Sequence, residues 1–535
     1  MNVAELLAIP ASMFPEAEIL WFEGEPRTYG SLLDGVARTA GALQALGVKP
    51  GDRVAVMQTN TPEVIETMLA VASIGAVFVP LNYRARREEL VHMLNVAAPR
   101  LLLVGDRYVE LATDLTRRPS GALEGRSRER ADELHVDVPM VVAIESQVQD
   151  LPHLKVLASG AEPITPFDVA EDELAVLMFT SGTTANAKAV MLAHDHLVNF
   201  VFGTTEPADG SDRGSVLLAA PIYHIAGLSA TLAASFAGRR IVVMRQFDAG
   251  EWLRLVASER ISHAFLVPTM LKRLLDHPAF PETDLSSLQV LSYGAAPMPL
   301  SVIRRAIEAF PPTVQFINAF GQTETASTVT MLGPEDHRLE GTPEVAERKL
   351  RRLGSVGRPL PDIELRILGE DGKPLPTGQV GEIALRTSRT MHGYYGQAEA
   401  TDRVLRGGWL QTGDLGWIDE EGYLFLTGRK SDLIIRGGEN IAPEEVELVL
   451  ESHPDIEEAA VVGLPDEEWG ERVAAVVVLR NGSGVAAGAL AEYCRERLAS
   501  FKKPEVIHVV EALPRNSMGK VLRTDLRAAL KDLGA

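Results

Sequence analysis

The spacing of hydrophobic and polar positions alternates between two periods along the first part of the chain. Residues 31–46 carry apolar side chains at helical spacing and are followed by Gly47, a residue type that commonly ends helices. Residues 53–57 form a short apolar run typical of a buried strand. This alternation predicts α/β layers around a mostly parallel sheet. The same order continues with helices expected at 63–74 and 88–95 and strands at 76–81 and 101–104.

Three further patterns follow along the chain. A second α/β series occupies residues 174–330, with strands expected at 216–219, 241–244, 264–267 and 290–292. From 354 to 426, short strands separated by Gly and Pro turns indicate a β-rich subdomain. The last hundred residues predict a small α+β domain, with helices at 443–451 and 487–498 and strands at 459–463, 474–479 and 506–509.

These patterns predict an α/β protein of two domains. We expect a large N-terminal domain of layered α/β sheets over residues 1–428, which includes the β-rich subdomain at 354–428. A hinge is expected at 429–432, because Gly428-Arg-Lys-Ser-Asp432 is a polar segment between a strand and the next apolar stretch. Residues 433–535 then form a small C-terminal α+β domain that acts as a lid.

Composition narrows the class of protein. The 535 residues are 46% hydrophobic and 23% charged, as in ordinary globular proteins. The formal net charge of −21 disfavours nucleic acid or an anionic membrane surface as a partner. The single cysteine, Cys494, excludes an internal disulfide. The N-terminus does not resemble a signal peptide and no apolar run is long enough to span a membrane, so we expect a cytoplasmic protein.

One short loop carries candidate chemistry. An apolar run ends at Phe179 and is followed by a cluster of hydroxyls and a glycine, with Lys188 four residues beyond the last of them. Backbone N–H groups and hydroxyls in such a loop can converge on an anion, and a lysine adds a point charge for phosphate oxygens. The pattern is not a Walker-type loop. By itself it fits either a phosphate site or a solvated Ser/Thr turn. The cluster consists of Thr180, Ser181, Gly182, Thr183 and Thr184.

Five more motifs follow in order along the chain: Ser292-Tyr-Gly-Ala-Ala-Pro-Met298, Asn318-Ala-Phe-Gly-Gln-Thr-Glu-Thr325, Gln411-Thr-Gly-Asp414-Leu, Gly428-Arg429 and Pro514-Arg-Asn-Ser-Met-Gly-Lys520. Together with the loop, they resemble the adenylate-forming superfamily of acyl-CoA synthetases, adenylation domains and luciferases. The resemblance extends from Thr28 to Lys520. It implies two half-reactions: a carboxylate attacks the α-phosphate of MgATP to give an acyl-adenylate and pyrophosphate, and a thiol, usually that of CoA, then displaces AMP.

The resemblance assigns a nucleotide site. It places Phe320 against adenine, although relatives usually carry Tyr there, and it gives Thr323 a hydrogen bond to the α-phosphate and Glu324 the Mg²⁺ ion. The alternative for Glu324 is a buried residue that caps a helix. The adenine slot is expected to be formed by Gly294, Ala295, Ala296, Pro297, Asn318, Ala319, Phe320 and Gly321.

The same resemblance assigns the ribose and the catalytic lysine. Asp414 is expected to accept both ribose hydroxyls, and Arg429 to reach ribose or phosphate. Lys520 is expected to bridge the attacking carboxylate and the α-phosphate, where it stabilises charge in the transition state. Lys188, Thr323 and Glu324 complete the expected catalytic set. Considered alone, Asp414 would be an ordinary turn residue.

Residues for the thiol and the acid come from two other segments. A mobile C-terminal domain would bring Lys520 in for adenylation and Arg436, Gly437, Gly438, Glu439 and Asn440 in for CoA. The Gly-Gly-Glu-Asn-Ile sequence resembles the corresponding motif of CoA ligases for fatty and aryl acids. The segment Pro221-Ile-Tyr-His-Ile-Ala-Gly227 matches the lining of the acyl pocket, with His224 as a gate, although a histidine in a turn is the alternative. The expected pocket residues are His224, Ala226, Gly227 and Gly294.

The chain departs from the superfamily pattern at four positions. Ala185, Ala187 and Ala189 stand where Gly, Pro and Gly are common, and Ser431 stands at the pivot where Asp or Lys is common. None of these changes removes a catalytic group. They bear on how fast the loop closes and the domains alternate.

We therefore expect an AMP-forming acyl-CoA synthetase that uses ATP, Mg²⁺ and CoA and acts in fatty acid metabolism on a medium- or long-chain fatty acid or an aryl acid. One alternative is a ligase that loads the acyl-adenylate onto a carrier protein. Another is a nucleotide-binding pseudoenzyme or sensor, which would not need Lys520. Nothing marks the oxidative step of a luciferase. No nucleic acid partner and no integral membrane segment are expected, and the sequence leaves a homodimer open.

Overall fold

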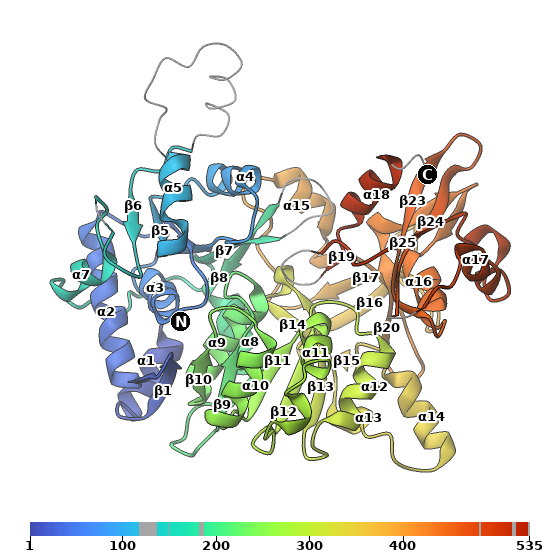
Figure 1. The fold of residues 1–535 in the computed structure, drawn as a ribbon. Helices are drawn as coiled ribbons and strands as arrows, with labels where there is room; N and C mark the ends of the chain where they lie inside the picture. Colours follow the sequence, from blue (N-terminus) through green and yellow to red (C-terminus); the bar gives the residue numbers. More distant parts are fainter. Residues whose placement is uncertain (117–135, 149, 181–186, 481–482, 516–519, 533–535) are drawn as a thin grey trace, which may run out of the picture. The chain divides into compact units, whose positions relative to one another are not determined.

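The computed structural model describes residues 1–116, 136–148, 150–180, 187–480, 483–515 and 520–532 (Figure 1). The chain forms two compact units. The larger comprises Met1–Leu350, Pro359–Ile363 and Arg386–Leu405, and the smaller comprises Arg351–Arg358, Glu364–Leu385 and Arg406–Ala535. The predicted β-rich region is therefore divided between the units, and the predicted hinge lies within the smaller one. The domain boundaries and the hinge stay predictions.

The first sheet of the larger unit has six strands in the order β6-β5-β3-β4-β7-β8. All its pairings are parallel except the last, in which β7 and β8 are antiparallel. Two interior strands, β4 and β5, are buried at every position, as expected for strands covered on both faces. The strands are β3 (Arg53–Met57), β4 (Val77–Pro80), β5 (Leu101–Val104), β6 (Val141–Ala143), β7 (Leu174–Thr180) and β8 (Lys188–Ala193).

The second sheet of the larger unit has nine strands in the order β15-β14-β13-β12-β11-β9-β10-β1-β2. It is parallel from β1 to β13, and the pairs β1–β2 and β13–β14 are antiparallel. The strands are β1 (Glu18–Phe22), β2 (Glu25–Thr28), β9 (Ser215–Leu218), β10 (Arg240–Val243), β11 (His263–Leu266), β12 (Val290–Gly294), β13 (Gln315–Gln322), β14 (Ser327–Leu332) and β15 (Arg358–Pro359).

Local sequence explains why the helices begin and end where they do. The side chain of Thr28 accepts a hydrogen bond from the backbone of Ser31 and caps α2, and Gly47 follows the helix with a φ of +84°. The helices are α1 (Glu5–Met13), α2 (Tyr29–Ala45), α3 (Pro62–Ser73), α4 (Arg87–Ala97), α5 (Val109–Thr116), α7 (Leu154–Ser159), α8 (His194–Thr204), α9 (Ile225–Ala237), α10 (Ala249–Ser258), α11 (Pro268–Leu275), α12 (Leu300–Ala309), α13 (Pro334–His337), α14 (Pro343–Arg352) and α15 (Ala398–Val404), with the 3₁₀ turn η3 (Thr323–Thr325).

The smaller unit contains two five-stranded sheets. One has the order β16-β17-β19-β18 with β20 beside β19, and the other has the order β22-β21-β24-β23 with β25 beside β24. The first is built from β16 (Glu364–Leu368), β17 (Gly381–Arg386), β18 (Leu405–Arg406), β19 (Trp409–Ile418) and β20 (Leu424–Arg429). The second is built from β21 (Ile434–Arg436), β22 (Glu439–Ile441), β23 (Ile456–Asp466), β24 (Gly470–Leu479) and β25 (Val506–Val510).

The C-terminal sheet has a core on each face. Along β23 and β24, alternate residues enter different clusters, because side chains on a strand point to opposite faces. Val461 belongs to the cluster that includes residues of α16 and α17, whereas Val462 belongs to the cluster with Leu526 and Leu530 of α18. The helices are α16 (Pro443–Glu451), α17 (Ala487–Arg495) and α18 (Arg523–Asp532).

The predicted fold class is confirmed, as are most of its elements. The strands expected at 53–57 and 101–104 and the helix at 443–451 have the predicted bounds. The helix expected at 31–46 is α2, and the strand expected at 459–463 is the core of the longer β23. The antiparallel strands β8 and β14 follow strands with candidate chemistry at their ends, and they position much of the site described next.

Candidate active site

The predicted phosphate loop connects two antiparallel strands. Thr180 at the end of β7 is the cross-strand partner of Lys188 at the start of β8. The register of the hairpin therefore fixes the position of Lys188 at the end of the sheet where the loop begins. Between them, Ser181, Gly182, Thr183, Thr184 and Ala185 lie outside the described residues. The neighbouring carbonyl of Ala187 bonds to Nε2 of His92 on α4 at 2.9 Å, so the altered loop is anchored at its C-terminal side.

Lys188 and Glu324 meet at a tyrosine that sequence reasoning missed. Glu324 lies in η3, directly after β13, and its Oε1 accepts a 3.0 Å hydrogen bond from the hydroxyl of Tyr394. The Nζ of Lys188 lies 4.7 Å from the centre of the same ring. Thr323 is the residue before Glu324 in η3. The structure thus brings the predicted phosphate-binding lysine and the predicted metal-binding carboxylate to one point.

The predicted adenine wall is a close contact between β12 and β13. Gly294 pairs with Ala319, and a Cβ on Gly294 would lie 2.1 Å from the carbonyl oxygen of Ala319. Any side chain there would force the strands apart. Ala295 follows with a φ of +64°, a left-handed conformation that lets the chain turn away from the strand. The residues expected around adenine lie at this turn and along β13: Ala296, Pro297, Asn318, Phe320 and Gly321.

A buried histidine, His337, hydrogen-bonds to Tyr293, the residue before Gly294 in this wall. The hydroxyl of Tyr293 and Nε2 of His337 are 2.8 Å apart, and Nδ1 of His337 lies 2.8 Å from the carbonyl oxygen of Gly333. A carbonyl only accepts, so Nδ1 carries the proton and Nε2 accepts from the tyrosine. Burial lowers the pKa of His337 to about 4, which keeps the ring neutral. Sequence reasoning missed His337 because it lies at the end of α13, whereas its partner Tyr293 lies on β12, far away in the sequence.

The predicted acyl-pocket segment is held by an asparagine from the other sheet. Asn60, which follows β3, donates from Nδ2 to the carbonyl of Ala220 at 3.0 Å and accepts from the backbone N–H of Ile222 at 3.0 Å. Its side chain is 2% exposed. Two residues further on, His224 is the N-cap of α9. Nothing in the local sequence marked Asn60 as part of this arrangement.

Small residues at the start of α9 are required by packing. A Cβ on Gly227 would lie 2.3 Å from the carbonyl oxygen of Pro221, so only glycine fits. Ala226 precedes it on the same turn. Tyr223 packs edge-on against Tyr83 with ring centres 5.0 Å apart. The glycine predicted to widen the pocket is therefore needed for the local backbone as well.

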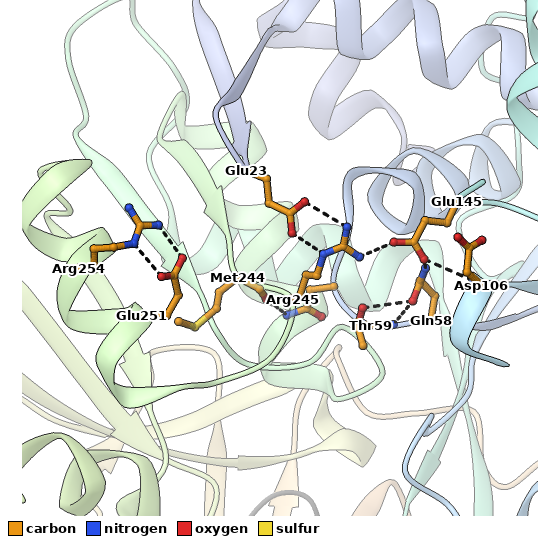
Figure 2. Close-up of polar contacts among 10 residues, drawn as sticks. Glu23, Gln58, Thr59, Asp106, Glu145, Met244, Arg245, Glu251 and Arg254 are labelled. Carbon is orange, nitrogen blue, oxygen red and sulfur yellow. Dashed lines mark hydrogen bonds and ion pairs between the residues drawn. The ribbon is translucent and has the colours of Figure 1, made fainter. Parts of the chain in front are cut away.

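A surface cavity of about 550 Å³ elsewhere in the larger unit is not this site. Figure 2 shows its charged side chains already paired, with Arg245 between Glu23 and Glu145 and with Arg254 on Glu251. Gln58 donates to the same Glu145 at 2.7 Å. None of the predicted site residues that the structure describes lines this cavity.

In the smaller unit, the predicted ribose acid and its neighbour form a pair. Asp414 on β19 and Arg429 on β20 are cross-strand partners, and Nε of Arg429 donates to Oδ1 of Asp414 at 2.9 Å. Burial raises the pKa of Asp414, and the charges of Arg429 and Lys520 oppose that shift. Lys520 is exposed, and its charge is close enough to be felt by the buried carboxyl. Two predicted site residues, Arg429 and Lys520, therefore act on a third, Asp414.

The predicted CoA segment is a tight hairpin. Gly437 and Gly438 connect β21 to β22 with φ values of +58° and +88°, and Arg436 pairs with Glu439 across them. Positive φ at both central residues is the signature of a type I′ turn, so the turn itself explains the glycines. Arg436 is an ion-pair partner of Glu505. Asn440 continues β22.

The predicted pivot is a short helical turn. Ser431 lies in η4 (Lys430–Asp432), between β20 and β21. Lys430 donates to Glu382 at 2.9 Å, and Asp432 lies 3.9 Å from Arg523. The segment is thus fixed by charge pairs on either side of Ser431.

The donor set suits Mg²⁺ only together with a nucleotide. Among the residues that the structure describes, no group of three or more His, Cys, Asp or Glu side chains could hold a metal ion. Mg²⁺ commonly binds one or two carboxylates, with substrate phosphates and water as its other ligands. A single Glu324 close to Lys188 fits that mode. When bound, the ion neutralises phosphate charge.

No helix in the described ranges combines the length and the apolar character that crossing a membrane requires.

The fold and this site define an adenylate-forming enzyme, with a large α/β part that carries nucleotide motifs and a smaller C-terminal part that carries the lysine motif. Specifically, the chain belongs to the AMP-binding enzyme family: the family model matches residues 8–395, and the model of the AMP-binding enzyme C-terminal domain matches residues 445–520. The resemblance inferred from the motifs is confirmed.

Similar proteins cover nearly the whole chain. It is 35% identical to the feruloyl-CoA synthase of Amycolatopsis sp, over 97% of this chain and 96% of that protein. It is 34% identical to the indoleacetate–CoA ligase of Aromatoleum aromaticum, over 98% of each. The solved structure of the amide bond synthetase McbA from Marinactinospora thermotolerans superposes with a TM-score of 0.84 at 30% identity, over 98% of this chain and 99% of that one.

Proposed function

We propose that this protein is an ATP-dependent acyl-CoA synthetase that activates a hydrophobic carboxylic acid as its adenylate and transfers the acyl group to CoA. The observation that carries the proposal is the group formed by Asp414, Arg429 and Lys520 in the smaller unit. These residues come from three separate motifs, and the charges of Arg429 and Lys520 both act on the buried Asp414 carboxyl. A ribose-binding acid beside a mobile cation is what transfer at an α-phosphate requires.

In the first half-reaction, one group of residues would hold the nucleotide and another would stabilise the charge that develops on the reacting oxygens. Asp414 would hold the ribose hydroxyls, and Gly294 and Phe320 would hold adenine. The carboxylate oxygen of the acid attacks the α-phosphorus and the bond to pyrophosphate breaks. Lys520 would stabilise the charge on the oxygens of both partners, and Lys188 would hold the phosphates that leave. Glu324 would hold Mg²⁺, which supplies neutralising charge.

The second half-reaction would use the C-terminal domain in another pose. The thiol sulfur of CoA attacks the carbonyl carbon of the acyl-adenylate, and AMP leaves. The hairpin of residues 436–440 would lie along the pantetheine arm, because Gly437 and Gly438 present backbone without side chains. The CoA ligases among the relatives support CoA as the acceptor.

The acid is proposed to be an aryl acid, with a medium- or long-chain fatty acid as the alternative. The feruloyl and indoleacetate groups that two relatives are named for both contain aromatic rings. Tyr223 packs against His224, and Tyr83 packs edge-on against Tyr223, so the two tyrosines would offer aromatic surface to such a substrate. Ala226, which is small and partly exposed, would leave room for it.

The test is pyrophosphate release with ATP and Mg²⁺ across a panel of aryl and fatty acids, with and without CoA. We expect turnover with one acid class only when CoA is present, together with formation of the thioester. A single burst that CoA does not change would overturn the choice of acceptor and indicate a carrier protein. An amine that discharges the adenylate would indicate the reaction named for McbA. No release with any acid would contradict the proposed function.

A further inference from the structure

Tyr394 lies between two side chains that come from distant parts of the sequence. Its hydroxyl donates to Oε1 of Glu324 at 3.0 Å, and its ring lies 4.7 Å from Nζ of Lys188. The side chain is 7% exposed. In the described part of the chain, Lys188 thus contacts the tyrosine ring and Glu324 contacts the tyrosine hydroxyl. One residue touches both charges without carrying a charge itself.

The backbone of residues 391–394 is hydrogen-bonded to the elements that carry Lys188 and Glu324. Tyr394 forms an antiparallel bridge with Val190 of β8, and the N–H of Met391 donates to the carbonyl of Glu324 at 2.9 Å. On its other side, the N–H of Tyr394 donates to the hydroxyl of Thr401 in α15 at 2.9 Å. The ring is therefore held in place by the strand of Lys188, by the turn of Glu324 and by a helix.

The two contacts have different chemistry. The phenol donates to one carboxylate oxygen and leaves the other oxygen to accept, which orients the carboxylate toward a cation. The ring face attracts the ammonium group of Lys188 by a cation–π interaction and so restricts its position. A lysine and a glutamate that contact the same side chain could otherwise pair with each other, and an ion pair would compete with a bound phosphate for the lysine and with a metal for the carboxylate.

We propose that Tyr394 is a positioning residue that keeps Lys188 and Glu324 apart and presents both to the magnesium-bound triphosphate of ATP. The proposal rests on the function proposed above. It assigns the hydroxyl to the metal side and the ring to the phosphate side, so two substitutions at one position separate the two roles.

The experiment compares Tyr394→Phe, which keeps the ring, with Tyr394→Leu, which keeps neither contact. The neighbouring Tyr395→Phe is the matched control, because it also loses one hydroxyl. Each protein is examined for ATP binding by calorimetry with Mg²⁺ and with EDTA, and for the Mg²⁺ concentration that half-saturates ATP–pyrophosphate exchange. The double variant Tyr394→Phe with Glu324→Gln tests whether the hydroxyl acts through the carboxylate.

We expect Tyr394→Phe to raise the half-saturating Mg²⁺ concentration by about tenfold, the effect of losing a hydrogen bond to a charged group. Its affinity for ATP in EDTA should equal that of the wild type, whereas Tyr394→Leu should weaken it by about threefold. An unchanged Mg²⁺ requirement in Tyr394→Phe, or the same loss on a Glu324→Gln background, would overturn the proposal. A wild-type protein that does not bind MgATP would instead overturn the proposed function.

Discussion

The charge of Lys520 acts on the buried carboxyl of Asp414 and opposes the rise in pKa that burial causes. Both residues lie in the smaller unit, in motifs far apart in sequence. This relationship links two motifs that are far apart in the sequence. The predicted catalytic lysine and the predicted ribose acid are electrostatically coupled, so a change in one is expected to alter the ionisation of the other.

Replacement of Lys520 by alanine is expected to separate the two half-reactions. Lys520→Ala should lower adenylation from the free acid by at least about a hundredfold, because charge at the α-phosphate loses its partner. The same variant should still convert a supplied acyl-adenylate to the thioester. Lys531→Ala, an exposed lysine in α18, is the control. Equal loss of both half-reactions would contradict the assigned role.

The ionisation of Asp414 predicts a pH dependence of nucleotide binding. Its pKa is raised by burial, so on acidification this carboxylate takes up a proton earlier than an exposed one. A protonated acid is a poorer acceptor for two ribose hydroxyls, so ATP affinity should fall as the pH decreases. Asp414→Asn should bind ATP about tenfold more weakly and without this pH dependence. Calorimetry between about pH 5 and 8 provides the measurement, with the exposed Asp402→Asn as control.

Asn60 is expected to affect the acid more than the nucleotide. Asn60→Ala removes the hydrogen bonds to Ala220 and Ile222 and leaves these buried backbone groups without that partner. We expect a loss of about 2 kcal/mol in unfolding free energy and a larger rise in KM for the acid than for ATP. Thr59→Val is a neighbouring control that keeps the asparagine. Equal changes in the two KM values would argue for a general loss of structure.

Buried histidines predict that the larger unit loses stability in acid. Burial lowers the pKa of His194, His196, His263 and His337 to about 4. The unfolded chain takes up these protons near pH 6.5, so stability should fall between about pH 6.5 and 4. Among the residues of this unit that the structure describes, Glu66 is the one carboxylate whose pKa burial raises, to about 7, and it acts in the opposite direction to the four histidines.

Hydrogen exchange can measure this effect within the larger unit. Amides of β11, the strand that carries His263, should lose protection when the pH falls from 7 to 5, after correction for intrinsic exchange rates. A single buried histidine is worth on the order of 1–2 kcal/mol over this interval. Protection that stays constant or increases would show that the folded protein accommodates the charged rings.

Much of the fold could be predicted because its strands are short apolar runs and its helices have clear ends. β3, β5 and α16 were placed at their observed bounds for this reason. The motifs likewise single out Lys188, Glu324, Asp414 and Lys520, because each sits in a distinctive local sequence, and their roles stay predictions.

The residues that were not predicted have their partners far away in the chain. Tyr394 touches Glu324, His337 touches Tyr293, and no local spacing indicates such contacts. Gly437 illustrates a second difficulty. The sequence predicts glycine there for the room that it leaves to CoA, but the type I′ turn alone favours glycine at this position. The sequence cannot separate these two explanations.

The two-sided core of the C-terminal sheet has a consequence for how this protein could be rebuilt. α16 and α17 cover one face and α18 covers the other, so the sheet buries its apolar side chains against helices of its own segment. A segment that supplies both covers of its sheet can be exchanged as a module. Grafting the corresponding segment of a relative after β20 should therefore give a folded chimera, because the grafted sheet arrives with the helices that cover both of its faces.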